Sequence, residues 1–343
     1  MVASIQRAVH GNNLERFVKE SQAWDVIIVD ECHHLSDWAE GGGSKTRMYQ
    51  LAEKLIEKQK EEKIGGRVIL MSGTPHQGHE SRFINLLALL KRKNEATDAI
   101  SGRVIYRTKE DVKDWHGRPL FPKRQINEPI VIELGLAYQA WLRNIFTYFK
   151  PEQEYDKQGR VGGWRCAQAL QWAASSPQAG VGYLIRQALR AGWQLDEEAL
   201  KNALSLIRPY RNGAEDESIQ ALYERIRGEV YEQDQDDTIE DIEEDQQNGK
   251  FVHNRAALRA LLDQGVQILR RSPYGKWETL KSKILDTAGD DKIVLFAQPI
   301  ETVTSLEKFI RQTMGVKSAI ISGGQSDEAR DEEIKRFSSK DGP

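Results

Sequence analysis

The first third of the chain alternates between short apolar runs and amphipathic stretches. The apolar runs at residues 24–29 and 68–71 are typical of strands buried on both faces of a parallel sheet, and residues 2–5 are a shorter strand candidate. Apolar residues recur at helical spacing in residues 12–21, 45–60 and 81–91. This alternation of strand and helix predicts a doubly wound α/β layer.

From about residue 135 to residue 286 the pattern predicts helices only. They are expected at residues 136–149, 164–174, 182–191, 195–207 and 251–271. The α/β pattern then returns, with strands expected at 293–296 and 317–321 and helices at 301–314 and 327–337. A parallel sheet of so few strands cannot bury both of its faces. We therefore expect each α/β region to be only part of a larger domain.

Composition narrows the class of protein. The 343 residues allow two domains, and 39% apolar with 29% charged residues is ordinary for a folded protein. A net charge of −3 gives no indication of nucleic-acid binding, so any basic track must be local. Cys32 and Cys166 lack the spacing of a disulfide framework or a zinc site. No apolar run is long enough to span a bilayer and no signal peptide is visible, so we expect a protein of the cytoplasm.

One segment is strongly acidic. Nine of the fourteen residues from 232 to 245 are Asp or Glu. A solvated, mobile linker is the simplest interpretation. A nucleic-acid mimic or an autoinhibitory segment is the alternative.

The strongest candidate chemistry follows the strand that ends at Val29. Asp30 and Glu31 come next, and they are followed by Cys32 and His33. A buried strand that ends in Asp-Glu puts two carboxylates at the carboxyl edge of a parallel sheet, where α/β folds bind ligands. In a nucleotide site the Asp holds Mg²⁺ through water, and the Glu polarises the water that attacks the γ-phosphate. The alternative is a pair of capping carboxylates at a strand–helix turn.

A second strand ends in small hydroxyl residues. Ser72, Gly73, Thr74 and Pro75 follow the run at 68–71, and alone they are a plain turn signal. We expect Ser72 and Thr74 to lie at the same sheet edge as Asp30, where they can hydrogen-bond to the segment that holds His33.

These two segments resemble motifs II and III of superfamily 2 helicases, and the SNF2 branch fits best. The run Arg107-Thr108-Lys109-Glu110-Asp111-Val112, with Pro122-Lys123-Arg124 after it, is similar to the connector of SNF2 proteins. Residues 292–297 resemble motif IV, and residues 321–337 resemble the next strand and helix. The loop at residues 74–78 and the stretch at 115–122 look closest to bacterial RapA-like and DISARM-type SNF2 proteins.

The resemblance implies a fold and an organisation. Residues 1–110 would be the later part of a RecA-like lobe with a doubly wound parallel sheet. Residues 111–288 would be a connector with α-helical insertions, including the acidic linker near 232–245. Residues 289–343 would begin a second RecA-like lobe.

The same resemblance implies a function. The parent protein would be a DNA-dependent ATPase that uses ATP and Mg²⁺ to move along double-stranded DNA, in the bacterial or archaeal cytoplasm near the nucleoid. Glu31 would be catalytic, and Asp30, His33, Ser72 and Thr74 would serve the nucleotide and its metal ion. Other subunits of a genome-defence or DNA-processing complex would be partners.

The chain departs from the family in the elements that grip phosphate. It contains no Gly-Lys-[Ser/Thr] loop, and it lacks motifs V and VI, the second of which supplies an arginine to the transition state. The Gly-rich stretch at 41–46 has Ser before Lys45 and follows no strand, so we interpret it as a flexible turn. We therefore expect this chain alone to be inactive. A non-catalytic DNA- or partner-binding protein built on the motor scaffold is the alternative, and a strand-separating helicase or nuclease-associated subunit is a third.

Three weaker signals remain. Basic residues with a few aromatics among them lie between 103 and 124, which suits contact with a phosphate backbone through Arg107, Lys109, Lys123 and Arg124. Three acidic residues dilute the stretch, so a solvated connector explains it equally well. Four histidines, at positions 33, 34, 76 and 79, could suggest a transition-metal site, but the helicase motifs explain them more simply. Trp residues at 141, 164, 172 and 193 lie in helical patterns, and we expect them to pack in the core.

Overall fold

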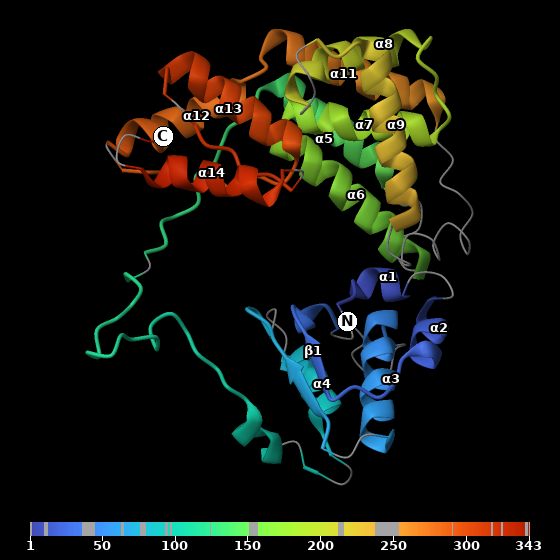
Figure 1. The fold of residues 1–343 in the computed structure, drawn as a ribbon. Helices are drawn as coiled ribbons and strands as arrows, with labels where there is room; N and C mark the ends of the chain where they lie inside the picture. The colour runs from blue at the N-terminus through green and yellow to red at the C-terminus, as the bar shows by residue number, and fades with distance from the viewer. Residues whose placement is uncertain are drawn as a thin grey trace. The chain divides into compact units, whose positions relative to one another are not determined.

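The structure is a computed structural model of the chain in two compact units, Met1–Glu128 and Pro129–Pro343 (Figure 1). It describes residues 2–9, 13–35, 45–62, 65–75, 80–92, 95–96, 98–123, 125–150, 157–211, 216–236, 254–289, 291–316, 318–323, 325–339 and 342. Each unit has its own hydrophobic core.

The first unit contains a small parallel sheet covered on one face by helices. Its elements are α1 (Ile5–Val9), α2 (Asn13–Glu20), β1 (Val26–Val29), the 3-10 helix η1 (Cys32–Leu35), α3 (Arg47–Glu62), β2 (Arg67–Leu70), α4 (Glu80–Leu90) and the 3-10 helix η2 (Asp98–Arg103). β1 and β2 pair with Val26 opposite Arg67 and Val29 opposite Leu70. Helix α3 is the crossover that parallel pairing requires.

The core of this unit lies between one face of the sheet and the helices. Alternate strand residues point into it, as the period of a strand demands. They pack against buried side chains of η1, α3 and α4, among them Leu35, Ile56 and Leu86. The helical spacing of apolar residues that predicted α3 and α4 therefore places one face of each helix against the sheet.

The other face of the sheet is open, and this overturns the predicted fold class. Val26, Ile28 and Ile69 are 48%, 59% and 44% exposed. A RecA-like doubly wound fold has a larger parallel sheet with helices on both faces, whereas the described residues form one sheet of two strands. The prediction was wrong because strand–helix alternation indicates parallel pairing but does not count the strands that a sheet finally contains. The strand expected at residues 2–5 is also absent, and Ile5 begins α1 instead.

The second unit is helical in its described part. Its elements are α5 (Leu136–Phe149), α6 (Lys157–Ser175), α7 (Pro177–Arg190), α8 (Glu198–Ile207), η3 (Arg208–Tyr210), α9 (Ile219–Asp236), α11 (Arg255–Arg271), α12 (Gly275–Lys283), η4 (Leu285–Thr287), α13 (Ile300–Met314) and α14 (Asp327–Ser338). Helix α7 is central, because it contacts α6, α8, α9, α11 and α13 (Figure 1). No helix in the described part of either unit has the length and hydropathy needed to cross a membrane.

The predicted second RecA-like lobe is a further correction. Residues 291–297 and 318–322 form no strand, and Val294 and Phe296 are 60% and 95% exposed. An apolar run becomes a strand only when a neighbouring backbone completes its hydrogen bonds, and the described residues supply none here. Helix α13, expected to cover a sheet, packs on α7 instead.

The acidic run is partly helical. Helix α9 ends at Asp236, so the run's first five residues belong to that helix and are not a linker. Residues 237–245 lie outside the described part of the chain. Helices α9 and α12 were not predicted, although Leu222, Tyr223, Ile226 and Val230 carry the helical spacing of α9 and are buried.

A buried ionic cluster ties α13 to the rest of the second unit. We call Arg186, Arg211 and Glu301 the Glu301 cluster. Glu301 is fully buried, and its Oε1 accepts hydrogen bonds from Arg186 Nη2 at 3.1 Å and Arg211 Nη1 at 2.7 Å. Arg211 also pairs with Glu229. The cluster connects α7, the end of η3, α9 and α13.

Candidate functional site

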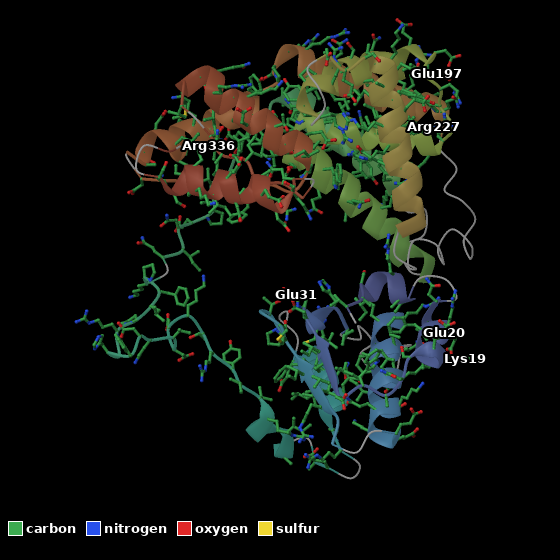
Figure 2. All side chains as sticks on the ribbon, in the orientation of Figure 1. Lys19, Glu20, Glu31, Glu197, Arg227 and Arg336 are labelled. Atoms are coloured by element: carbon green, nitrogen blue, oxygen red, sulfur yellow. The ribbon has the colours of Figure 1, made fainter. Side chains whose placement is uncertain are left out.

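The carboxyl ends of β1 and β2 meet at one edge of the sheet. Met71 N donates to Val29 O at 2.9 Å, which extends the ladder by one bond. Cys32 N then donates to Met71 O at 2.9 Å, so the turn after β1 is tied to the residue after β2. These backbone bonds bring the two predicted segments together, and Figure 2 labels Glu31 at this end of the sheet.

Glu31 occupies an unusual backbone conformation. Its φ is 47°, in the left-handed region that a residue with a Cβ rarely adopts. Asp30 Oδ1 accepts the Glu31 N–H at 2.9 Å, and Glu31 O accepts the His34 N–H at 3.0 Å. Such a conformation costs about 1–3 kcal/mol, and these bonds help to hold it. The result is a carboxylate that projects from the sheet edge with 59% of its side chain exposed.

His33 links the two segments through its ring. Its Nδ1 lies 3.0 Å from Ser72 Oγ and 3.1 Å from Glu31 Oε2, and its side chain is only 13% exposed. An ionised carboxylate can only accept, so Nδ1 must carry a proton that is shared between Glu31 and Ser72. The contact therefore selects the tautomer and couples Glu31 to the segment after β2.

Ser72 takes part in this edge through its side chain, and Thr74 takes part through its backbone. Ser72 Oγ accepts the Thr74 N–H at 3.1 Å in addition to its contact with His33. The predicted hydrogen bond between Ser72 and the segment that holds His33 is thus present. Thr74 is exposed and takes part through its backbone, which closes the turn after β2.

Cys32 is a structural member of this edge. It is 4% exposed and packs in the core of the first unit. Burial raises the pKa of its thiol to about 11, and the charges of Glu31 and Asp30 act in the same direction. A thiol with that pKa is almost wholly protonated at neutral pH, which makes Cys32 a poor nucleophile.

The two carboxylates fit the requirements of a hydrated Mg²⁺ ion. Both are exposed, and among the described residues Asp30 forms no ion pair while Glu31 pairs with His33. Magnesium takes oxygen ligands and usually keeps several waters beside one or two carboxylates and phosphate oxygens. No group of three or more Asp, Glu, His or Cys residues is assembled in the parts of the chain that the structure describes. Asp30 and Glu31 would therefore hold the ion only together with water and a phosphorylated ligand.

The candidate nucleic-acid residues lie on the segment after η2. Arg107, Lys109 and Lys123 are exposed, and Lys109 Nζ lies 5.6 Å from the centroid of the Phe121 ring. Among the described residues, no hydrogen bond or ion pair joins them to Asp30 or Glu31. Arg124, the Gly-rich stretch up to residue 44 and the histidines at 76 and 79 lie outside the described residues.

Sequence reasoning missed the main-chain part of this edge. The Met71 carbonyl that anchors the turn and the left-handed backbone at Glu31 have no residue-type signal, because both depend on the backbone of the pair of strands. No protein-family model matches the chain, and no solved structure matches it.

Proposed function

We propose that this chain supplies the magnesium- and water-positioning edge of an SNF2-type ATPase that moves along double-stranded DNA in the cytoplasm. The proposal rests on the local strand–turn geometry and on the sequence motifs, and it does not require a doubly wound sheet. Mg²⁺ and ATP are the cofactors, and double-stranded DNA is the partner. Other subunits of a genome-defence or DNA-processing complex are further partners under the same proposal.

The observation that carries the proposal is the contact of His33 with both Glu31 and Ser72. Asp-Glu-x-His and Ser-Gly-Thr-Pro segments each occur by chance, but here one imidazole joins them at distances of 3.0 and 3.1 Å. A capping pair of carboxylates would need neither this link nor the left-handed backbone at Glu31.

Each residue then has a defined task. Asp30 holds the metal ion through water, and Glu31 accepts a hydrogen bond from the attacking water and takes up its proton. His33 orients the Glu31 carboxylate, and Ser72 holds the His33 ring. The Mg²⁺–nucleotide complex contributes the electrophilic phosphorus and the neutralisation of charge on its oxygens.

The phosphate-gripping elements are assigned to residues outside these 343. The sequence holds no Gly-Lys-[Ser/Thr] loop and no motif VI arginine. An arginine of that kind contributes about 10³–10⁵ to the rate of phosphoryl transfer. The chain alone is therefore expected to bind ATP weakly and not to hydrolyse it.

The test has two stages. The gene is first sequenced beyond both ends of this reading frame, where the proposal requires a Gly-Lys-[Ser/Thr] loop upstream and an arginine-rich motif downstream. DNA-stimulated ATP hydrolysis by the extended protein is then compared with that of Glu31→Gln. The loss of a general base should lower kcat by about 10²–10⁴. Glu61→Gln, which changes an exposed carboxylate of α3, is the matched control and should leave kcat unchanged.

Two results would contradict the proposal. The first is an extended protein in which Glu31→Gln hydrolyses ATP as fast as the unmodified protein does. The second is hydrolysis by the 343-residue chain itself that Glu31→Gln abolishes, because the missing loop would then be unnecessary. If the flanking sequence holds neither motif while DNA binding persists, a non-catalytic DNA- or partner-binding function replaces the ATPase.

A further inference from the structure

A small hairpin after η2 presents an exposed tryptophan. Lys113 and Pro119 form an antiparallel bridge, and Leu120 N donates to Val112 O at 3.0 Å. Asp114 N donates to Arg118 O at 2.8 Å and closes the loop. Trp115 sits in that loop and is 93% exposed. We call residues 112–120 the Trp115 hairpin.

The loop is held by its own polar groups. Asp114 Oδ1 accepts hydrogen bonds from His116 N and Arg118 N, both at 2.8 Å. Gly117 has a φ of 77°, which glycine adopts without steric cost. The Trp115 and His116 rings meet edge to face with centroids 5.1 Å apart. A tryptophan on this organised turn is presented to solvent at little cost in conformational entropy.

The two aspartates nearest the hairpin bond to local polar groups and, in the part of the chain that the structure describes, form no ion pair with its cations. Asp111 Oδ2 accepts from Thr108 N and Thr108 Oγ1, both at 2.7 Å, and Asp114 is used inside the loop. Two of the nearby acidic side chains thus serve backbone and hydroxyl donors. Among the described residues, Lys113 and Arg118 form no ion pair. Both cations are exposed and lie on the same hairpin as the tryptophan.

We propose that the Trp115 hairpin binds unpaired nucleotides, with the indole of Trp115 stacked on a base and Lys113 and Arg118 beside the phosphates. An exposed aromatic ring with two exposed cations on the same hairpin matches the chemistry of a single strand, which offers both a base face and a phosphate charge. A fully paired duplex hides its base faces. The inference rests on the proposed function only in taking nucleic acid as the partner, and it adds a preference for unpaired segments.

The test is fluorescence anisotropy of a labelled oligothymidylate of about 20 nucleotides, without ATP or Mg²⁺, against a duplex of the same length. Trp115→Ala should weaken binding of the oligothymidylate by about 5- to 100-fold, and Trp115→Phe by less than about threefold because the ring still stacks. Binding of the duplex should be equal for all three proteins. Because Trp115 is exposed, circular dichroism should show no change of fold in either variant.

Salt dependence tests the two cations separately. Lys113→Gln with Arg118→Gln should lower the slope of log K against log salt by about 1.4, at about 0.7 per lost contact with a single strand. Lys19→Gln with Lys201→Gln removes the same charge from α2 and α8, where both lysines are exposed, and should leave the slope unchanged.

The proposal is overturned if the unmodified chain does not bind the oligothymidylate, or if Trp115→Ala binds it as tightly as the unmodified chain does. It is also overturned if Trp115→Ala weakens duplex and single strand equally. Glu31→Gln should bind the oligothymidylate normally. If the ATPase proposal fails, the binding of unpaired nucleotides at the Trp115 hairpin is not affected. If the hairpin does not bind them, the proposal for the nucleotide site is not affected either.

Discussion

At the scale of single residues, Glu301 shows how the second unit accommodates buried charge. Burial by itself raises the pKa of this carboxyl, but the neighbouring Arg186 and Arg211 outweigh that effect and hold the pKa below its ordinary value. Burial and the charge of Arg211 lower the pKa of Arg186, yet an arginine starts so far above neutrality that it stays charged. Glu301 is therefore an ion between two ions at pH 7.

We predict that Glu301→Gln destabilises the protein by about 3–5 kcal/mol at pH 7, because the buried guanidinium of Arg186 loses its counter-charge and that of Arg211 keeps only Glu229. A carboxyl with a lowered pKa in the folded state stabilises above its unfolded pKa of about 4.3, and that contribution is lost as the pH falls through the folded value. The difference in the free energy of unfolding between Glu301→Gln and the unmodified protein should therefore become smaller below about pH 4. Urea unfolding at a series of pH values measures both effects.

The control for this prediction lies on the same helix. Glu307 pairs with Arg311 one turn away at 3.5 Å, and that arginine is 62% exposed. Glu307→Gln should cost less than about 0.5 kcal/mol. Equal losses in the two variants, or a loss in Glu301→Gln that is the same at every pH, would refute the account of the Glu301 cluster.

At the scale of elements, close helix packing in the second unit depends on a glycine. A Cβ at Gly265 of α11 would lie 2.6 Å from Val181 Cγ2 and 2.7 Å from Trp141 Cζ2. Trp141 is fully buried and donates its Nε1–H to Leu261 O at 2.9 Å, so the indole cannot retreat without losing that bond. The missing side chain lets α11 approach α5 and α7.

We predict that Gly265→Ala destabilises the protein by about 1–3 kcal/mol through overpacking. Gly228→Ala on α9 is the matched substitution, because a Cβ there meets nothing within 4 Å. It should stabilise by about 0.5–1 kcal/mol, since alanine loses less backbone entropy in a helix. Thermal and urea unfolding measure both, and a stabilising Gly265→Ala would show that the helices can separate to admit the methyl group.

Helices were predicted correctly where the spacing of apolar residues in the sequence matches the face that the helix buries. Helix α5 has the predicted bounds, and Trp141 and Trp193 are buried as expected, whereas Trp172 is only partly buried. The side chain of Trp164 lies outside the described part. Strands were less predictable, because residues 293–296 have the apolar run of a strand without a partner for its backbone. The Glu301 cluster was not predicted, because its members are far apart in the chain and charged residues are seldom buried.

The candidate site was predictable to the same extent. Parallel pairing alone requires the residues after β1 and β2 to share an edge, so the proximity of Glu31 and Ser72 followed from two apolar runs. The ring contact of His33 and the left-handed backbone of Glu31 depend on the turn, and no residue type announces them.

At the scale of the whole molecule, the stretch between η2 and α5 separates two cores. The residues that the structure describes between 104 and 135 form no regular helix or strand beyond the hairpin bridge, and most of them are exposed. An exposed, extended backbone is what a protease active site requires.

We predict that limited trypsin digestion cuts first after Arg107, Lys109 or Lys123, and that a helical fragment from the second unit survives longest. Mass spectrometry of early digests identifies the bonds that are cut. The triple variant Arg107→Gln, Lys109→Gln, Lys123→Gln should delay the first cut. First cuts within α7, after Arg186 or Arg190, would contradict the division into two units.

The open face of the two-stranded sheet affects how long this polypeptide persists in a cell. Val26, Ile28 and Ile69 present the kind of apolar surface that chaperones retain and degradation machinery recognises. The amount of this protein should therefore be set less by its rate of synthesis than by how quickly that surface is shielded.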